Sequence, residues 1–402
     1  MIHLPLVSLT DTTAQIFIAV IAVVTTLVAL LGKPRWYPLI GSALTGVIVW
    51  LVLEKLWHPF PDKVPAVVYV AGSAAVFVLV CAIVQRRWLV GILAIIALVN
   101  AGAVANVIYQ QYPTLRSLNP IPVTVEMTYD QFRNQQAAPT VNDREVGALV
   151  TVPMHTPGFA ARDAMAYVPP AYWSKPDREL PVLVLLAGNP GKPAQWFGAG
   201  EASQTADDYQ STHDGLSPIV ISVDATGSLT GNPGCVDGPK DKVDTYLSSE
   251  VPQMVKEKFR VVADQSRWTI GGLSYGGTCA LQIVTNHPDS YGSFLDFSGQ
   301  AEPSLGTRQQ TIDTLFSGDE AAFDAVNPAT LLANNRYPTT QGRFVAGEDD
   351  PSAEEALQHL NDLAQKAGMT TTYETVPGGH SYQVWRVALV ETFEWAAQRG
   401  GL

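Results

Sequence analysis

Four apolar stretches near the N-terminus strongly constrain how this chain can fold. They run over Thr13–Leu31, Trp36–Leu53, Val64–Val84 and Trp88–Tyr109, and none has a charged residue inside it. Each is about as long as a helix that crosses the hydrocarbon core of a bilayer. Tryptophan and tyrosine lie near their ends, as in an interfacial aromatic belt. The pattern predicts an all-α domain of four transmembrane helices over residues 1–110, embedded through residues 13–109.

Two other interpretations of these stretches fit less well. Buried helices of a water-soluble core normally keep one polar face, and four such runs in about a hundred residues leave none. A cleavable signal peptide begins with basic residues, but the first 12 residues contain no Lys or Arg. We therefore expect the four runs to stay in the protein as an anchor.

Basic residues in the loops predict the orientation of the four helices. The loops after the first and third runs hold four basic residues, and the loop after the second holds two that are balanced by acids. These are Lys33, Arg35, Arg86 and Arg87 on one side, and Lys55 and Lys63 with Glu54 and Asp62 on the other. Loops rich in Lys and Arg stay in the cytoplasm. We expect a multi-pass protein of the plasma membrane whose C-terminal domain is extracytoplasmic.

The charge of the remaining chain excludes some partners. Residues 1–110 hold six basic and three acidic residues, and the whole chain has a net charge of −12, so residues 111–402 carry −15. Nucleic-acid binding needs Lys and Arg opposite phosphates, so we expect no nucleic-acid partner. The sequence also shows no spacing typical of metal ligands, and we expect neither a metal nor another cofactor. Protein partners stay unassigned.

The C-terminal two-thirds alternate short apolar strands with helices. Residues 111–142 are interpreted as a polar, Pro-rich linker that leads into a first strand at Val123–Tyr129. Residues 143–402 form the next domain, with strands expected over 145–152, 163–168, 182–186, 219–223, 268–271, 293–297, 343–346 and 371–375. Such alternation predicts an α/β domain with a mostly parallel sheet covered by helices on both faces. Its active site should lie at the carboxyl ends of the strands.

One strand leads into the motif Gly272-Leu-Ser-Tyr-Gly276, and a helix follows it. This is the G-x-S-x-G pattern in the strand–turn–helix context that gives it meaning. The serine stands on a sharp, strained turn, so the residues two before and two after it must be small. The pattern predicts that Ser274 is a nucleophile.

A serine nucleophile needs a base and an acid. Among the seven histidines, His380 alone follows the last strand on a glycine-containing loop, Val376-Pro-Gly-Gly379, and we expect it to be the general base. The acid should follow the preceding strand, where Glu348, Asp349 and Asp350 compete. We favour Asp350, with Asp349 second. Residues 301–332, between serine and acid, have room for a small helical cap that includes Ser304–Thr307 and Asp319–Phe323.

The tetrahedral intermediate of such a reaction needs two N–H donors. Tyr275, directly after the nucleophile, supplies one. The other should come from Ala187-Gly-Asn-Pro-Gly191, where Pro190 has no N–H and is excluded. We favour Asn189, with Gly188 or Gly191 as alternatives.

Three cysteines occur in the chain. Cys81 lies in the third apolar run, Cys235 in a glycine-rich loop, and Cys279 five residues after Ser274. If the C-terminal domain is outside the cytoplasm, Cys235 and Cys279 can form a disulfide that ties this loop to the helix after the nucleophile.

Residues from about 145 to 400 resemble the esterase D and mycolyltransferase (antigen 85) branch of the α/β-hydrolases. Four segments carry the resemblance: Asp244-Thr-Tyr-Leu-Ser-Ser-Glu-Val-Pro252, Gly272-Leu-Ser-Tyr-Gly276, Asn286-His-Pro288 and Gly379-His-Ser-Tyr-Gln-Val-Trp385. The resemblance implies an α/β-hydrolase fold, Ser274 and His380 as catalytic residues, an acyl-enzyme mechanism and an actinobacterial cell envelope as the setting. The segment Gly347-Glu-Asp-Asp350 resembles the esterase side of the branch, which favours Asp350.

One departure from the mycolyltransferases bears on the substrate. Enzymes of that group carry Asp-Gly at the oxyanion turn, whereas this chain has Ala187-Gly188. We therefore expect a membrane-anchored serine esterase that hydrolyses lipid-like acyl or aminoacyl esters of the cell envelope. An acyltransferase that passes the acyl group to a sugar or protein hydroxyl is the alternative, and a non-catalytic assembly module is a further one.

Overall fold

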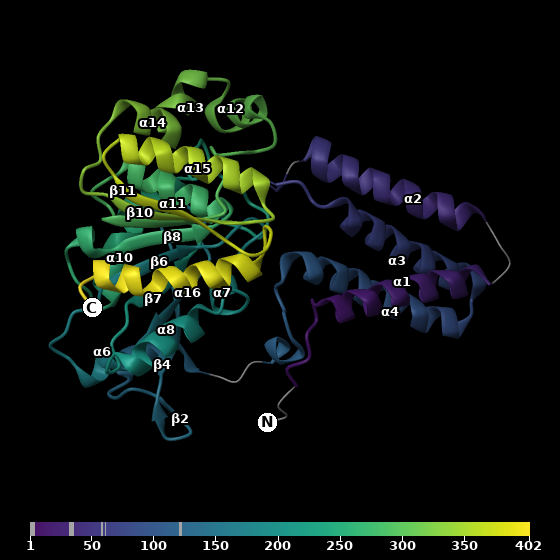
Figure 1. The fold of residues 1–402 in the computed structure, drawn as a ribbon, viewed down its shortest axis with the longest axis horizontal. Helices are drawn as coiled ribbons and strands as arrows, with labels where there is room; N and C mark the ends of the chain where they lie inside the picture. The colour runs from purple at the N-terminus through teal and green to yellow at the C-terminus, as the bar shows by residue number, and fades with distance from the viewer. Residues whose placement is uncertain (1–4, 32–35, 58, 61, 120–122) are drawn as a thin grey trace. The chain divides into compact units, whose positions relative to one another are not determined.

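The computed structural model of this protein describes residues 5–31, 36–57, 59–60, 62–119 and 123–402. The chain divides into two compact units, Met1–Ile121 and Pro122–Leu402, which are described separately below (Figure 1). Lys33 and Arg35, on which part of the predicted orientation rests, lie outside the described residues. So do residues 120–122 of the predicted linker.

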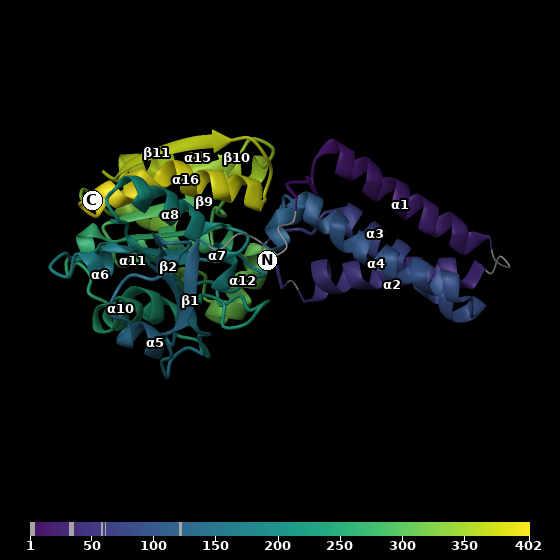
Figure 2. The same cartoon turned by 90° about the horizontal axis from the view of Figure 1, so that it is seen from below.

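The first unit is a group of four long helices. They are α1 (Thr12–Leu30), α2 (Trp36–Leu51), α3 (Ala66–Gln85) and α4 (Trp88–Tyr109), and a π-helical turn, Val52–Leu56, extends α2. Helix α3 packs against the other three (Figure 2). The tight contacts are made by small side chains such as Ala75 and Ala94, together with Val78 and Val90. Small residues let apolar helices approach closely, which is how helices associate in a bilayer.

Most apolar side chains of these four helices point away from the small core. Ile95 is 65% exposed and Val99 is 70% exposed, although both lie in the middle of α4. Some polar groups here are paired: the Gln85 side-chain amide donates to the Ala29 carbonyl, and Glu54 accepts hydrogen bonds from Tyr69 and the Val64 N–H. All four helices are long and apolar enough to cross a membrane.

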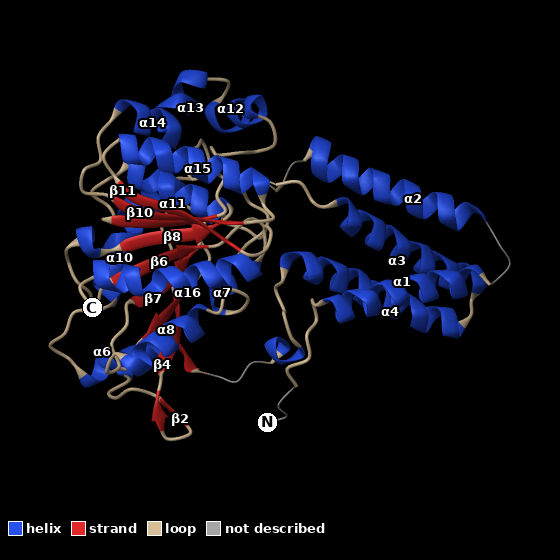
Figure 3. Ribbon diagram, in the orientation of Figure 1, coloured by secondary structure: helices blue, strands red, loops and turns tan. Residues whose placement is uncertain are grey.

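The second unit is built on a nine-stranded sheet within the described residues (Figure 3). Its strands are β1 (Thr124–Thr128), β4 (Gly147–Val152), β5 (Ala164–Val168), β6 (Val182–Leu186), β7 (Ile219–Val223), β8 (Thr269–Leu273), β9 (Ser293–Phe297), β10 (Gln341–Gly347) and β11 (Thr370–Val376). The order across the sheet is β1-β4-β5-β7-β6-β8-β9-β10-β11. Only β5 runs antiparallel to its neighbours. The predicted fold class, a mostly parallel sheet of the α/β-hydrolase type, is confirmed.

Helices cover both faces of this sheet and enclose two cores. Helices α10 (Val251–Lys258), α11 (Tyr275–Asn286) and α15 (Pro351–Lys366) close the larger core. Helices α7 (Ala194–Phe197), α8 (Ala202–Thr212) and α16 (Tyr382–Arg399) close the smaller one on the opposite face. The central strands are buried on both sides, which explains why they read as continuous apolar runs.

Several short elements complete the second unit. They are α5 (Tyr129–Asn134), the hairpin β2 (Thr140–Val141) and β3 (Arg144–Glu145), α6 (Ala171–Ser174), α9 (Val243–Thr245) and a π-helical turn (Tyr246–Glu250) that leads into α10. Neither this hairpin nor α8 was predicted from the sequence. Helix α8 buries mainly small and polar side chains, among them Ala202, Ala206 and Asp207. Its apolar stripe is therefore too faint to see as a periodicity.

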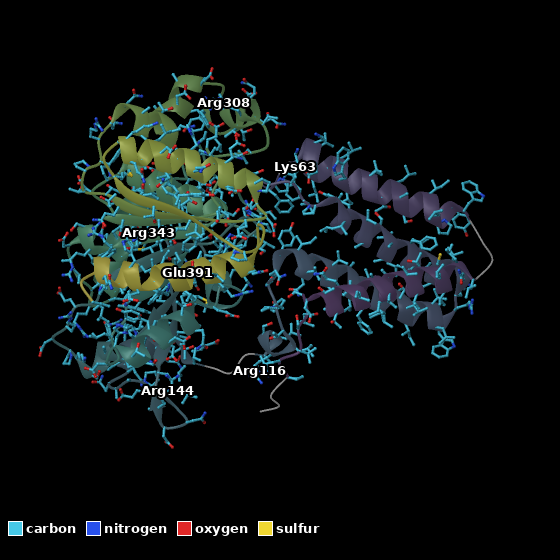
Figure 4. The ribbon with its side chains drawn as sticks, viewed as in Figure 1. Lys63, Arg116, Arg144, Arg308, Arg343 and Glu391 are labelled. Carbon is cyan, nitrogen blue, oxygen red and sulfur yellow. A yellow bond between two sulfur atoms is a disulfide. The ribbon has the colours of Figure 1, made fainter. Side chains whose placement is uncertain are left out.

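Three helices lie between β9 and β10 in the chain: α12 (Arg308–Phe316), α13 (Glu320–Val326) and α14 (Pro328–Asn334). The predicted helical piece at Ser304–Thr307 is wrong, because Thr307 is the N-cap of α12 and its side chain accepts from the Gln310 N–H. Arg308, labelled in Figure 4, is the first residue of α12 and binds Glu302 at 2.5 Å and Asp324 at 2.7 Å. The Asp324 contact joins α12 to α13, and the Glu302 contact joins α12 to the segment before it.

Candidate active site

Ser274 lies between the end of β8 and the start of α11, in a strained backbone conformation. Its φ is 53° and its ψ is −122°, a region that residues with a Cβ rarely adopt. The two motif glycines make the turn feasible: a Cβ on Gly272 would lie 2.3 Å from the carbonyl carbon of Gly276, and a Cβ on Gly276 would lie 2.3 Å from the Leu186 oxygen. The serine is 3% exposed and stands at the carboxyl edge of the sheet.

His380 and Asp350 lie together on the loops that follow β11 and β10. The His380 Nδ1 is 2.6 Å from the Asp350 Oδ2. The two loops approach closely because Gly347 has no side chain: a Cβ there would lie 2.3 Å from the Gly378 oxygen. Trp385 packs edge-on against the His380 ring, with ring centres 5.1 Å apart. Ser274, at the end of β8, comes from another strand of the same parallel set.

The structure separates the three acids that the sequence left in competition. Asp350 is 8% exposed and holds the imidazole, whereas Glu348 and Asp349 are exposed. Asp350 is also the N-cap of α15, since its Oδ1 accepts from the Ala353 N–H. One carboxylate oxygen therefore caps a helix and the other orients the histidine.

Replacing Asp350 with asparagine is expected to lower kcat/KM about 10²–10⁴-fold, because an amide does not stabilise the imidazolium or fix its tautomer. The fold should survive, since asparagine caps a helix about as well as aspartate. Kinetics of the full chain in detergent with a p-nitrophenyl ester check this. Asp349→Asn is the matched control and should stay within about twofold; a larger loss in the control than in Asp350→Asn would assign the acid to Asp349.

Of the predicted oxyanion donors, Tyr275 directly follows Ser274, and Gly188, an alternative for the second donor, lies beside it. Tyr275 opens α11, and its buried ring anchors the turn because its hydroxyl donates to the Ala225 carbonyl at 3.0 Å. On the other side, a Cβ on Gly188 would lie 3.5 Å from the Ser274 Cβ. The Gly191 N–H donates to the Leu229 oxygen, which removes it from the alternatives. Asn189 and Gly188 thus stay as candidates for the second donor.

A disulfide joins Cys235 to Cys279, with the two Cα atoms 5.6 Å apart. Cys279 is on α11, and Cys235 is in the loop after β7. The same loop contacts the oxyanion turn at residues 187–191, because the Asn189 side-chain amide donates to the Gly231 oxygen at 2.6 Å. The disulfide therefore ties α11, which follows Ser274, to a loop that is hydrogen-bonded to the oxyanion turn.

Two polar residues beside Ser274 were missed by the sequence analysis. The Gln300 Nε2 donates to the Ser274 Oγ at 3.4 Å, and Thr278 on α11 binds Gln300. Gln300 follows β9, the neighbour of β8 in the sheet. Its position just beyond the carboxyl end of a central strand was the available signal, since that edge is where sites form in such sheets.

Asp296 on β9 is a fully buried carboxyl group directly below this turn. Its Oδ1 accepts from the Gly299 N–H at 2.9 Å, and a Cβ on Gly277 of α11 would lie 2.3 Å from that oxygen. The Oδ2 atom has no hydrogen-bond partner among the described residues. Burial raises the pKa of Asp296 to about 8, so the group is mainly protonated at neutral pH.

Asp296→Asn is expected to stabilise the protein more at pH 8 than at pH 5. The native carboxyl keeps a proton that the unfolded chain releases above its ordinary pKa of 3.8. Its contribution to stability is therefore fully present below pH 4 and is lost as the pH rises to about 8, at no more than about 1.4 kcal/mol per pH unit. Asparagine does not ionise. Thermal midpoints of variant and wild type at both pH values check this, and a pH-independent difference would contradict it.

His287 shows that two of the family-like segments contact each other. Its Nε2 lies 2.6 Å from the Asp244 Oδ2, and this carboxylate raises the pKa of His287. The histidine ends α11, while Asp244 precedes α10. This pair joins the ends of two helices that cover the sheet.

Comparisons with known proteins identify a family and a relative that this chain resembles. The esterase family model matches residues 160–396. An uncharacterized protein of Corynebacterium glutamicum is 58% identical over 418 residues, which cover 98% of each chain. This relative extends the likeness over the four N-terminal helices, which the family model does not reach.

A solved structure with a TM-score above 0.5 shares the fold of the second unit. A ferulic acid esterase has a TM-score of 0.51 and 18% identity, covering 59% of this chain and 92% of its own. An S-formylglutathione hydrolase from Agrobacterium tumefaciens is also similar, with a TM-score of 0.48 and 21% identity. The match covers 59% of this chain and 89% of the hydrolase. Mycobacterium tuberculosis MPT51 has a TM-score of 0.44 and 18% identity, and the match covers 65% of this chain and 99% of MPT51. Because the esterase family model matches more than half of the residues of this chain, the chain belongs to the esterase family.

Proposed function

We propose that this protein is a membrane-anchored serine esterase that acts outside the cytoplasm on lipid-type esters through an acyl-enzyme on Ser274. The observation that carries the proposal is the constellation at the carboxyl edge of the sheet: a serine on a strained turn, and a histidine 2.6 Å from a buried aspartate. This arrangement suits nucleophilic catalysis, because the serine hydroxyl becomes reactive only when a positioned base takes its proton.

The proposed reaction has two halves. The Ser274 Oγ attacks the ester carbonyl while the His380 Nε2 takes its proton, since Nδ1 is held by Asp350. The carbonyl oxygen gains negative charge and is stabilised by the N–H groups of Tyr275 and Asn189. His380 then protonates the leaving alcohol. Water attacks the acyl-enzyme in the same way, and the acid is released.

Two features support the location and the substrate class. Disulfides persist in oxidising compartments, so the Cys235–Cys279 bond favours a unit outside the cytoplasm. The four apolar helices, if they cross the membrane, keep the site near a lipid surface and raise the local concentration of lipid-borne esters. The residue before Gly188 is alanine rather than an acid that would hold a sugar, which favours water as the acceptor.

The test offers the purified full chain in detergent a long-chain acyl ester, with and without trehalose, and identifies the products by mass spectrometry. We expect free fatty acid in both cases and none with Ser274→Ala. A trehalose ester as the main product would assign the protein to the acyltransferases instead. Absence of any turnover across a panel of acyl and aminoacyl esters would contradict both activities.

A further inference from the structure

The side chain of Gln300 contacts the oxygen that reacts. Its Nε2 lies 3.4 Å from the Ser274 Oγ, and it donates a hydrogen bond to that atom. Gln300 belongs neither to the G-x-S-x-G turn nor to the histidine and acid loops. It reaches Ser274 from the segment after β9, which is adjacent to β8 in the sheet.

Thr278 binds the oxygen end of the Gln300 amide. The Thr278 Oγ1 donates to the Gln300 Oε1 at 2.7 Å and accepts from the Gln300 backbone N–H at 2.8 Å. A hydroxyl can accept one hydrogen bond while it donates another, so Thr278 binds both the backbone N–H and the side-chain oxygen of Gln300. With Oε1 on Thr278, the NH₂ group lies on the side of Ser274.

We propose that Gln300 is a further catalytic residue, a hydrogen-bond donor that stabilises negative charge on the Ser274 Oγ; this proposal rests on the proposed function. During acylation the Oγ loses its proton to His380 as it forms the bond to the acyl carbon. During deacylation water adds to that carbon and gives a proton to His380; the bond from carbon to Oγ then breaks, its electron pair goes to Oγ, and His380 passes this proton to Oγ. In both halves Oγ carries partial negative charge beside the Gln300 N–H.

Such a donor accelerates the reaction only if it binds the transition state better than the resting serine. Hydrogen bonds to a charged oxygen are roughly twice as strong as those to a neutral hydroxyl, so the contact strengthens as charge develops. A full oxyanion-hole donor contributes about 10²–10³-fold to kcat. For a single donor at 3.4 Å we expect a smaller effect, about tenfold.

Two variants of similar shape test the role. Gln300→Met removes the donor, and Gln300→Glu replaces it with a negatively charged acceptor. We expect kcat for a p-nitrophenyl ester to fall about tenfold in Gln300→Met and further in Gln300→Glu, with KM changed less than about twofold. The rate of labelling by a fluorophosphonate should fall in the same order, because labelling needs the same attack by Oγ. Thermal midpoints of the full chain in detergent report any loss of folding.

Thr278→Val supplies the second line of evidence. It removes the hydroxyl that orients the amide, so it should lower kcat less than Gln300→Met does, and the double variant should be no slower than Gln300→Met alone. Wild-type kcat in Gln300→Glu, or a loss that follows a lowered thermal midpoint in all variants, would overturn the role of Gln300 while the proposed function stands. A folded wild type that a fluorophosphonate does not label would remove the proposed function itself.

Discussion

Ser274→Ala and His380→Ala are each expected to lower kcat/KM for an ester by about four to six orders of magnitude. The reason is that the nucleophile and its base act as one unit, so removal of either leaves only the oxyanion donors and substrate binding. The measurement is initial-rate kinetics of the full chain in detergent with an activated ester. Both variants should bind a non-reacting ester analogue with the affinity of the wild type, because neither change removes the N–H donors of the oxyanion turn.

Ser298→Ala is the matched control for this experiment. Ser298 follows β9 at the same edge of the sheet, is fully buried and has a φ of 54°, close to the 53° of Ser274. It differs in that no G-x-S-x-G turn surrounds it. Its replacement should change kcat/KM by less than about threefold. Equal losses in Ser298→Ala and Ser274→Ala would indicate that the edge of the sheet, rather than the Ser274 hydroxyl, is needed.

Removal of the Cys235–Cys279 disulfide has the second large expected effect, on stability. The bond closes a loop with a sequence separation of 44 residues, and chain entropy predicts a stabilisation of about 4 kcal/mol for a loop of that size. Cys235→Ala/Cys279→Ala should therefore lower the thermal midpoint of the second unit by on the order of 10 °C. Activity should fall as well, because the Cys235 loop also holds Asn189 at the oxyanion turn.

A reducing agent provides the control for the disulfide. Dithiothreitol should bring the wild type down to the midpoint of the double variant and leave the double variant unchanged. Peptide mapping under non-reducing conditions should find Cys235 and Cys279 in one linked peptide. Two free thiols, or a midpoint that neither reduction nor mutation moves, would contradict the tether and would remove one support for an extracytoplasmic site.

Strands and helices of the second unit were largely predictable, because they carry strong local patterns. All eight strands expected between 145 and 375 are present, and the helix after Ser274 begins at Tyr275. Gly272 and Gly276 predict the turn, because a side chain at either position would clash with the backbone. Helix α8 escaped prediction because its buried face is made of small and polar residues.

Contacts between distant segments set the limit of the prediction. The sequence placed Glu348, Asp349 and Asp350 in one loop, but only the close approach of Gly347 to Gly378 turns Asp350 toward His380. Likewise, Gln300 and Thr278 are 22 residues apart, and nothing local in either segment shows that they meet beside Ser274. Asp296 is similar: its carboxyl is unusual because of its burial beneath α11, a property of packing rather than of its neighbours in sequence.

The most direct test of the central claim is to treat the full chain in detergent with a fluorophosphonate probe and map the adduct by mass spectrometry. An acyl-enzyme mechanism predicts one covalent adduct on Ser274, absent in Ser274→Ala and strongly slowed in His380→Ala, but retained in Ser298→Ala. A well-folded wild type that takes up no probe, or an adduct on any residue other than Ser274, would contradict the account.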